Sequence, residues 1–194
     1  MGKIFCLMGK SSSGKDTIFR EIKEDKNLGL LPIIGYTTRP KRTDETNGVE
    51  YYFIDNNTLS GYRECGKLIE ERVYNTVSGD WHYCTLDDGQ IDLSKNYILI
   101  TTLESYNSLK AYFGEEYVVP FYIKVDDGIR LERALIREMK QENPNYDELC
   151  RRFLADSVDF SEENLSKLGI KKSYSNYDLD KCIDKIKKEI LNLI

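Results

Sequence analysis

The chain is poor in the residue types from which metal centres and disulfide frameworks are built. It contains one histidine, His82, and its five cysteines are odd in number and scattered, with no C-x-x-C pair. With a single histidine we propose neither a metal site built from several histidines nor a Ser-His-Asp catalytic triad. Dispersed cysteines are typical of reduced thiols, so we expect a cytoplasmic protein without a zinc site or a disulfide frame.

Long apolar segments and an excess of basic residues are also missing. No run approaches the length of a membrane-spanning helix, and the apolar run in MGKIFCLMG is too short for a signal peptide. The net charge of −5 argues against nucleic acid as the main partner, although a small anionic ligand needs only a local cluster of Arg and Lys. We therefore expect no membrane and no nucleic-acid partner.

Apolar runs alternate with helical periodicities along the 194 residues, which predicts an α/β fold. The runs KIFCLM, NYILITT and VVPFYIKV are typical of strands buried on both faces of a parallel sheet. Further strands are expected at LPIIGYTT, VEYYFID, KLIEERVYN and GDWHYCTL, with Ser78 and Gly79 turning between the last two. Helices are expected at residues 15–26, 103–113, 127–141, 146–167 and 179–193.

These elements predict one domain with an interruption. No internal repeat, low-complexity tract or Pro/Gly-rich linker divides the chain. We expect a helix-flanked parallel core at residues 1–35 and 93–194, interrupted by a small β-rich lobe at about 36–92.

The stretch GKSSSGKDT has the G-x-x-x-x-G-K spacing of a phosphate-binding loop. It lies between a predicted strand and a predicted helix, which is the context that this motif requires. Gly9 and Gly14 let the backbone wrap around phosphate oxygens, and Lys15 can reach the β- and γ-phosphates. The competing interpretation is a polar turn that happens to contain a lysine.

The residue after Lys15 is unusual, because Asp16 occupies a position that normally holds a hydroxyl for magnesium. The hydroxyl comes one residue later, at Thr17. Asp16 is either a metal contact or a favourable charge at the helix N-terminus, and the helix-dipole interpretation is the preferred one.

A second basic cluster is TTRPKR, in which Arg39 and Arg42 flank a proline and precede Tyr51 and Tyr52. Guanidinium groups suit a phosphate because their planar fork donates two hydrogen bonds at once, and a tyrosine hydroxyl adds a neutral donor. By itself the cluster is equally typical of a solvated basic loop.

Together these motifs resemble the guanylate kinase family. GKSSSGKDT, YTTRPKR, NGVEYYFI, LIEE, GDWHYCT and SNYDLDKCIDKI occur in that family's order, and the resemblance covers essentially the whole chain. It implies a P-loop NTPase-type fold with an inserted nucleoside-monophosphate-binding lobe and a helical lid at about 130–152. Its implied partners are a nucleoside monophosphate and ATP, with Mg²⁺ as cofactor. Nucleoside-monophosphate kinases often have a hydroxyl residue at the position of Thr17, so the resemblance implies Thr17 as the metal contact.

The resemblance also implies roles for individual residues. It assigns ATP to Gly9, Ser12, Ser13, Gly14, Lys15, Asp16, Thr17 and Asn176, the last of these near adenine. It assigns GMP to Arg39, Arg42, Tyr51 (with Tyr52 as the alternative), Glu70, Tyr83, Thr85 and Thr102. A carboxylate such as Glu70 suits guanine, because it can accept from the adjacent N1–H and N2–H₂ donors.

Lid arginines complete the implied catalytic set. Arg133 and Arg137 are four residues apart on one predicted helix, and the third lid arginine falls at Arg152 in CRRF. With Lys15 and Arg42 they would gather charge around the migrating phosphoryl group. The alternative is an amphipathic helix surface with Glu132 and Glu138 as partners.

Two departures from the family pattern fall on guanine recognition. Thr102, in LITT, stands where a base-contacting Asp is expected, and Gly35 replaces a serine that helps to bind the acceptor. Trp81 and His82 are interpreted as packing around the acceptor pocket.

The sequence thus predicts ATP-dependent phosphorylation of a nucleoside monophosphate, GMP by preference. The alternatives are a kinase of this fold acting on another phosphorylated acceptor, such as a ribose bisphosphate or another nucleotide, and a guanylate-kinase-like binding module without catalysis. An intact Lys15 and a length of one domain disfavour the binding module.

Overall fold

Five parallel strands form the central sheet, in the order β2-β7-β1-β8-β9. The structure is a computed structural model that describes residues 1–76 and 79–194. The strands are β1 (Ile4–Met8), β2 (Leu30–Pro32), β7 (Asn96–Ile100), β8 (Val118–Lys124) and β9 (Ser173–Ser175). The predicted parallel α/β core is therefore confirmed.

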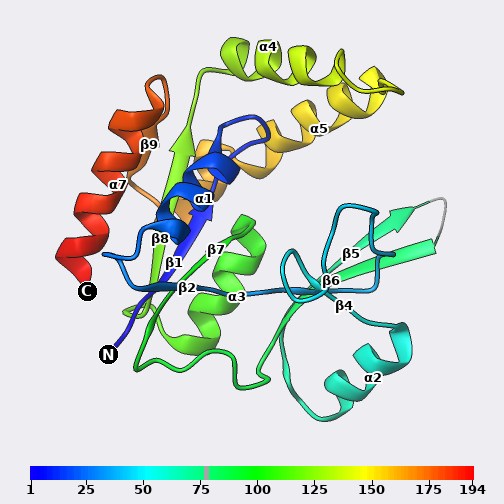
Figure 1. Ribbon diagram of the computed structural model, residues 1–194, viewed down its shortest axis with the longest axis vertical. Coiled ribbons are helices and arrows are strands. Elements are labelled where there is room, and N and C mark those ends of the chain that lie inside the picture. The colour runs from blue at the N-terminus through cyan, green and yellow to red at the C-terminus, as the bar shows by residue number, and fades with distance from the viewer. Residues whose placement is uncertain (77–78) are drawn as a thin grey trace.

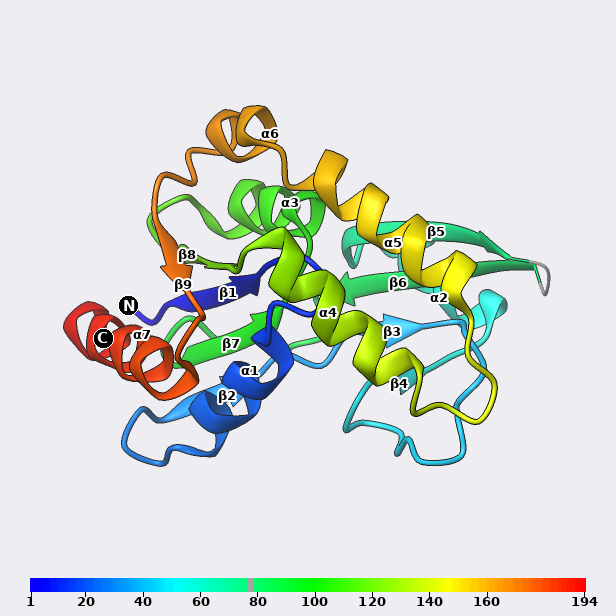
Figure 2. The same cartoon turned by 90° about the horizontal axis from the view of Figure 1, so that it is seen from above.

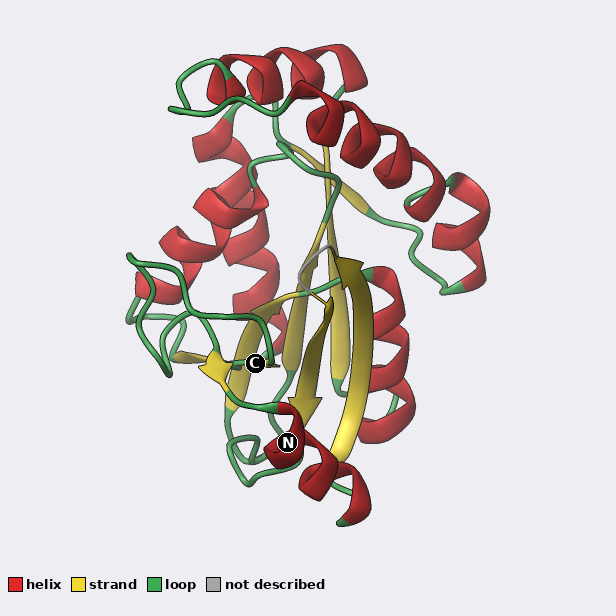
Figure 3. Cartoon of the chain, turned by 90° about the vertical axis from the view of Figure 1, so that its right-hand side faces the viewer, coloured by secondary structure: helices red, strands yellow, loops and turns green. Residues whose placement is uncertain are grey.

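Helices cover both faces of this sheet (Figure 3). Helices α1 (Lys15–Glu24) and α7 (Leu179–Leu193) lie on one face, and α3 (Leu103–Phe113) and α6 (Glu162–Lys167) on the other. Strand β1 shows why both faces are apolar, because Phe5 and Leu7 pack toward α1 and α7 whereas Cys6 packs toward α3. This arrangement places the carboxyl end of β1, where the phosphate-loop motif begins, at the edge of the sheet from which α1 starts.

A separate mixed sheet lies beside the core (Figure 1), in the order β4-β3-β6-β5. Its strands are β3 (Tyr36–Thr37), β4 (Tyr52–Phe53), β5 (Leu68–Thr76) and β6 (Gly79–Leu86), and helix α2 (Asn56–Glu64) packs on one face. We call this sheet with α2 the lobe. The turn predicted at Ser78 lies outside the described residues.

Helices α4 (Asp127–Glu138) and α5 (Tyr146–Asp159) extend from the core beyond the sheet. They pack against each other and lie above the phosphate-loop motif and toward the lobe (Figures 1 and 2). We call this pair the lid helices. Two residues separate the end of β8 from the start of α4, and α5 leads back toward α6.

Three predicted elements differ most in their extent from the structure. LPIIGYTT is two strands in different sheets, because the chain leaves the core at Ile34, whose N–H donates to Gln90 Oε1, and enters the lobe at Tyr36. VEYYFID is a strand only at Tyr52–Phe53, since the residues before it form a turn at Gly48 with φ 81°. The helix predicted at 146–167 breaks before Ser161, which caps α6.

Helix α2 and strand β9 were not predicted. Asp55 caps α2 by accepting from the Thr58 N–H at 2.7 Å, which is a sequence-visible signal. Strand β9 has three residues, too few for a periodicity to show.

Candidate nucleotide site

The predicted phosphate loop connects the buried strand β1 to helix α1. Gly14 takes the left-handed conformation with φ 86°, and α1 begins at the next residue, Lys15. Gly9 is required for close packing, because a Cβ there would lie 2.7 Å from the carbonyl oxygen of Ile123. The loop is thus held tightly against β8, with the positive end of α1 at its edge.

Several polar atoms at this loop are buried without a partner among the described residues. They are the hydroxyls of Ser12 and Ser13 in the loop and the Oδ1 atom of Asn176 beside it. Unpaired buried polar groups cost free energy, and in native proteins they are concentrated at sites that meet a ligand or water. This is the property expected of a loop that receives phosphate oxygens.

Asn176 lies behind the loop. Its side chain is 3% exposed, and its Nδ2 donates to the Ser13 carbonyl at 2.8 Å. The structure therefore gives Asn176 a role in holding the loop, whereas its predicted contact with adenine stays a prediction.

The first turn of α1 contains Asp16 and Thr17, the two candidates for a contact with magnesium. Lys15 Nζ lies 3.6 Å from Asp16 Oδ2, and Asp16 is largely exposed while Thr17 is half-buried. Among the described residues no group of three or more His, Cys, Asp or Glu side chains could hold a metal ion. A single hydroxyl or carboxylate fits Mg²⁺, because this ion binds nucleotides through phosphates and waters with few protein ligands.

The basic loop after β3 is folded around Arg39, which is 4% exposed. Its guanidinium donates to both carboxylate oxygens of Glu45, at 2.7 and 3.0 Å, and to the Tyr83 hydroxyl at 3.1 Å. The hydrogen bonds from Arg39, followed by that from the Arg42 N–H, lower the pKa of Glu45 to about 2. A carboxylate therefore occupies the position at which Arg39 would bind a phosphate.

Tyrosine rings line the same face. The Tyr51 ring lies 5.5 Å from the Tyr83 ring and 5.9 Å from the Arg39 guanidinium. Burial raises the pKa of Tyr51, so its hydroxyl stays protonated and available as a donor. Tyr52 instead packs on Tyr36 in the interior of the lobe, with ring centroids 4.8 Å apart, so it is Tyr51 that the structure brings to the arginine.

Glu70 is buried on β5 and accepts from the Thr85 hydroxyl at 2.8 Å. It also accepts from Arg72, at 3.1 Å from Nε and 3.4 Å from Nη2. Sequence reasoning missed Arg72, although its position two residues after Glu70 on a strand places both side chains on one face. The predicted guanine-reading carboxylate is thus paired with a guanidinium of the same chain.

Thr102 caps helix α3, where its hydroxyl accepts from the Ser105 N–H. Helix α3 packs against β5, the strand of Glu70. At Gly35 an added Cβ would make ordinary contacts, the shortest 3.4 Å from the Cys84 carbonyl, so the missing serine side chain would fit. The two departures therefore leave the backbone arrangement intact.

The interpretation of His82 as acceptor-pocket packing is wrong. In the register of β5 and β6, Arg72 is opposite Tyr83 and Glu70 opposite Thr85, whereas His82 is opposite Val73. Neighbouring residues on a strand face opposite sides, so His82 points away from Tyr83. Its Nδ1 lies 2.5 Å from Glu71 Oε1, and Glu71 also pairs with Arg63 of α2.

The lid helices, the basic loop and the phosphate loop meet at one cavity of about 360 Å³. Three of the predicted catalytic arginines, Arg42, Arg137 and Arg152, line it together with Ser11. Arg133 does not belong to this group, because its Nη2 lies 3.4 Å from the Asn176 carbonyl, at the back of the phosphate loop. The structure thus brings arginines from three separate segments to the border of the loop.

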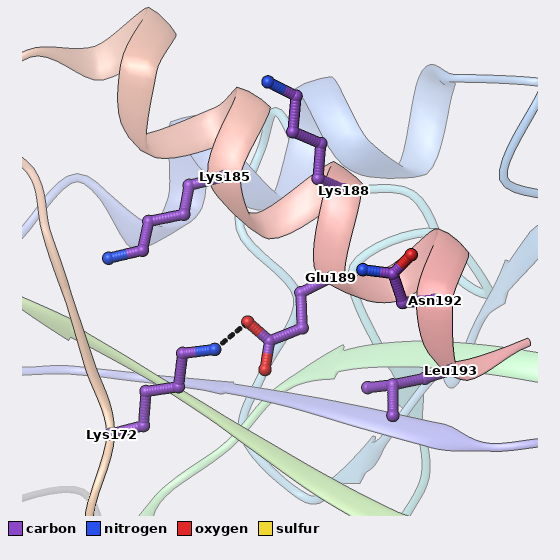
Figure 4. A pocket seen from close by; sticks show the side chains of 6 residues that line it. All are labelled: Lys172, Lys185, Lys188, Glu189, Asn192 and Leu193. Atoms are coloured by element: carbon purple, nitrogen blue, oxygen red, sulfur yellow. Dashed lines mark hydrogen bonds and ion pairs between the residues drawn. The ribbon is translucent and has the colours of Figure 1, made fainter.

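A second hollow, of about 470 Å³, lies between β9 and the end of α7 (Figure 4). It is lined by Lys172, Lys185, Lys188, Glu189, Asn192 and Leu193. Lys172 pairs with Glu189 there, and the motif residues of the nucleotide site are absent from its lining. The larger hollow is therefore not the candidate site.

None of the helices in the described residues is both long and apolar enough to cross a membrane.

Comparisons with known proteins relate the chain to guanylate kinases. Residues 1–84 match the family model described as guanylate kinase. A guanylate kinase of Porphyromonas gingivalis is 26% identical over 100% of this chain and 99% of its own length, and one of Mycoplasmoides gallisepticum is 27% identical over 98% and 92%. The crystal structure of guanylate kinase from Anaplasma phagocytophilum superposes with a TM-score of 0.68 at 18% identity, covering 98% of this chain and 85% of that one. The chain is thus similar over its whole length to proteins named guanylate kinase, and its first 84 residues match the model of that family.

Proposed function

We propose that the protein transfers the γ-phosphoryl group of ATP to a nucleoside monophosphate, with GMP as the preferred acceptor. The observation that supports this best is the cavity at which Arg42, Arg137 and Arg152 meet Ser11 of the phosphate loop. Phosphoryl transfer needs cations around the migrating group and little covalent help, which is what such a cavity offers.

In the proposed reaction an oxygen of the acceptor phosphate bonds to the γ-phosphorus while the bond to the β–γ bridging oxygen breaks. The products are ADP and a nucleoside diphosphate. Lys15 and the loop N–H groups hold the donor phosphates, and Arg39, Tyr51 and Tyr83 hold the acceptor phosphate. Magnesium, with Thr17 as its proposed protein contact, supplies further charge neutralisation when bound with ATP. The residues 36–92 and the lid at 130–152 are proposed to close over the two nucleotides and exclude water.

Another phosphorylated acceptor is the second candidate, and the pairing of Arg72 with Glu70 favours it. A guanidinium offers the same donors as the guanine edge, so it satisfies the carboxylate that guanine would need. Thr102 and Gly35 lie in the same half of the site and lack the side chains that the family uses for guanine.

A coupled ADP-release assay tests both candidates across GMP, dGMP, AMP, UMP, CMP, dTMP and ribose bisphosphate. The highest kcat/KM with GMP is expected. A preference for another acceptor favours the second candidate. The absence of transfer to any acceptor, with Lys15→Ala identical to the wild type, contradicts both and favours a binding module.

A further inference from the structure

Arg130 is a fully buried charge at the point where the lid helices meet the phosphate loop. Its side chain is 1% exposed, and Nη1 donates to the Ser11 carbonyl at 2.9 Å. Asp127, at the start of α4, accepts from Nε at 3.0 Å and from Nη2 at 2.8 Å. The guanidinium also lies 4.6 Å from the centre of the Phe153 ring on α5.

Asp156, near the end of α5, binds the backbone N–H of the same loop residue, Ser11. Its Oδ2 accepts from the Ser11 N–H at 2.7 Å and lies 3.4 Å from Arg130 Nη1. Both backbone polar groups of Ser11 are therefore bound by charged side chains of the lid helices. Asp127 adds a contact to the preceding residue, with its Oδ1 3.3 Å from Lys10 Nζ.

The residue that follows Ser11 has an unfavourable backbone conformation, which the surrounding structure has to impose. This residue, Ser12, has φ 61°, a left-handed conformation that is unfavourable for a residue with a Cβ. Its hydroxyl is buried and has no hydrogen-bond partner in the described part of the chain. Such a conformation persists only when the surrounding structure imposes it. The hydrogen bonds to the neighbouring Ser11 restrain the backbone next to Ser12.

We propose that Arg130 and Asp156 are positioning residues that fix the phosphate loop from the base of the lid, and so set its affinity for the donor phosphates. The inference rests on the proposed function, because it takes the loop as the ATP site. Arg130, Ala134 and Arg137 lie on one face of α4. On α5, Arg152 and Phe153 precede Asp156 by about one turn. The two helices that bind Ser11 therefore also bring Arg137 and Arg152 to the cavity.

The experiment measures ATP binding by calorimetry without acceptor, and then KM for ATP and for GMP separately. Arg130→Met and Asp156→Ala are expected to weaken ATP binding by about tenfold or more, because each removes a charged group that binds a backbone polar group of Ser11. KM for the acceptor should stay within about twofold, because neither residue contacts the acceptor half of the site in the described structure. Asp156→Asn retains an oxygen for the Ser11 N–H and should recover most of the affinity.

The matched control is Arg20→Met, on the exposed side of α1, which should bind ATP like the wild type. Where Arg130→Met does not fold, as judged by circular dichroism, Arg130→Lys takes its place. It should retain a donor to Ser11 and show intermediate affinity.

Unchanged ATP affinity in the folded variants would overturn the inference. So would tighter ATP binding by Asp156→Ala, because the carboxylate would then compete with the donor phosphates, or an Asp156→Asn variant no better than Asp156→Ala. A wild-type protein that neither binds ATP nor transfers phosphate contradicts the proposed function instead, so the two failures are distinguishable.

Discussion

The proposed donor and acceptor halves of the site differ in how their polar groups are satisfied. In the donor half the hydroxyls of Ser12 and Ser13 are buried without a partner among the described residues, and the loop is already folded against β8 and the lid helices. In the acceptor half the charges are paired with each other, Arg39 with Glu45 and Glu70 with Arg72. The donor half is thus arranged for a ligand, whereas an acceptor has to displace partners that belong to the chain.

This contrast makes acceptor affinity a difference between two sets of interactions. In the proposed acceptor site a phosphate would compete with Glu45 for Arg39, and a guanine would compete with Arg72 for Glu70. Specificity in this half therefore depends on intramolecular competitors as well as on contacts to the ligand.

The largest expected effect is that of Lys15→Ala, which attacks the donor half. Phosphoryl transfer should fall by a factor on the order of a thousand, because the cation nearest the β- and γ-phosphates is lost. Single-turnover assays with saturating ATP measure it. The fold should survive, since Asp16 is the only ion-pair partner of Lys15 in the described residues. Transfer within about twofold of the wild type would contradict the role of Lys15.

Glu70→Ala tests the acceptor half and should act on one nucleotide only. KM for GMP should rise by about tenfold to a hundredfold with ATP binding unchanged, because a charged hydrogen-bond acceptor is removed from the base edge. Steady-state kinetics with each substrate varied in turn give the split. An unchanged acceptor preference across nucleotides would remove Glu70 from base recognition.

The variant Arg72→Met tests whether Arg72 competes with the acceptor for Glu70. If guanine replaces the guanidinium on Glu70, the variant should use GMP several-fold better, because Glu70 no longer has to leave Arg72. If the acceptor is instead held by Arg72, its KM should rise. Kinetics with GMP and with the best non-guanine acceptor distinguish these outcomes, and Arg63→Met, on the opposite face of the lobe, is the matched control.

The smallest effect concerns the pH dependence of lobe stability. The folded pKa of Glu45 is lowered to about 2 from an ordinary 4.5, so its stabilisation is complete above the ordinary value and is lost as the pH falls toward 2. Glu45→Gln should lower Tm near neutral pH and flatten its dependence across that window. Calorimetric unfolding at several pH values measures this, with the exposed Glu64→Gln as control. Identical pH slopes for Glu45→Gln and the wild type would contradict the assignment.

Local sequence signals predicted the core and the phosphate loop well. KIFCLM and GKSSSGKDT specify a buried strand, a glycine turn and a helix start through residues that are neighbours in the chain, and the structure has β1, the loop and α1 there. The same holds for α3 and α7, whose observed bounds equal the predicted ones.

What the sequence did not predict depends on partners that are distant in the chain. Ser11 is bound by side chains 119 and 145 residues further on, and no local pattern marks Arg130 as buried or Asp156 as a partner of the loop. His82 was misassigned because its face depends on the register between β5 and β6. The pairing of Arg72 with Glu70 could have been found, since alternate residues of a strand share a face.

The hydrogen bond from Asn176 to Ser13 has a consequence for the biogenesis of the protein. It joins residues 163 positions apart, and Asn176 follows directly on β9, whose contacts to β8 are among the last that the chain can make. During synthesis the phosphate loop leaves the ribosome early but lacks this support until the C-terminal segment docks. Truncated chains that end before β9 should therefore bind ATP at the proposed donor site more weakly than the full chain does.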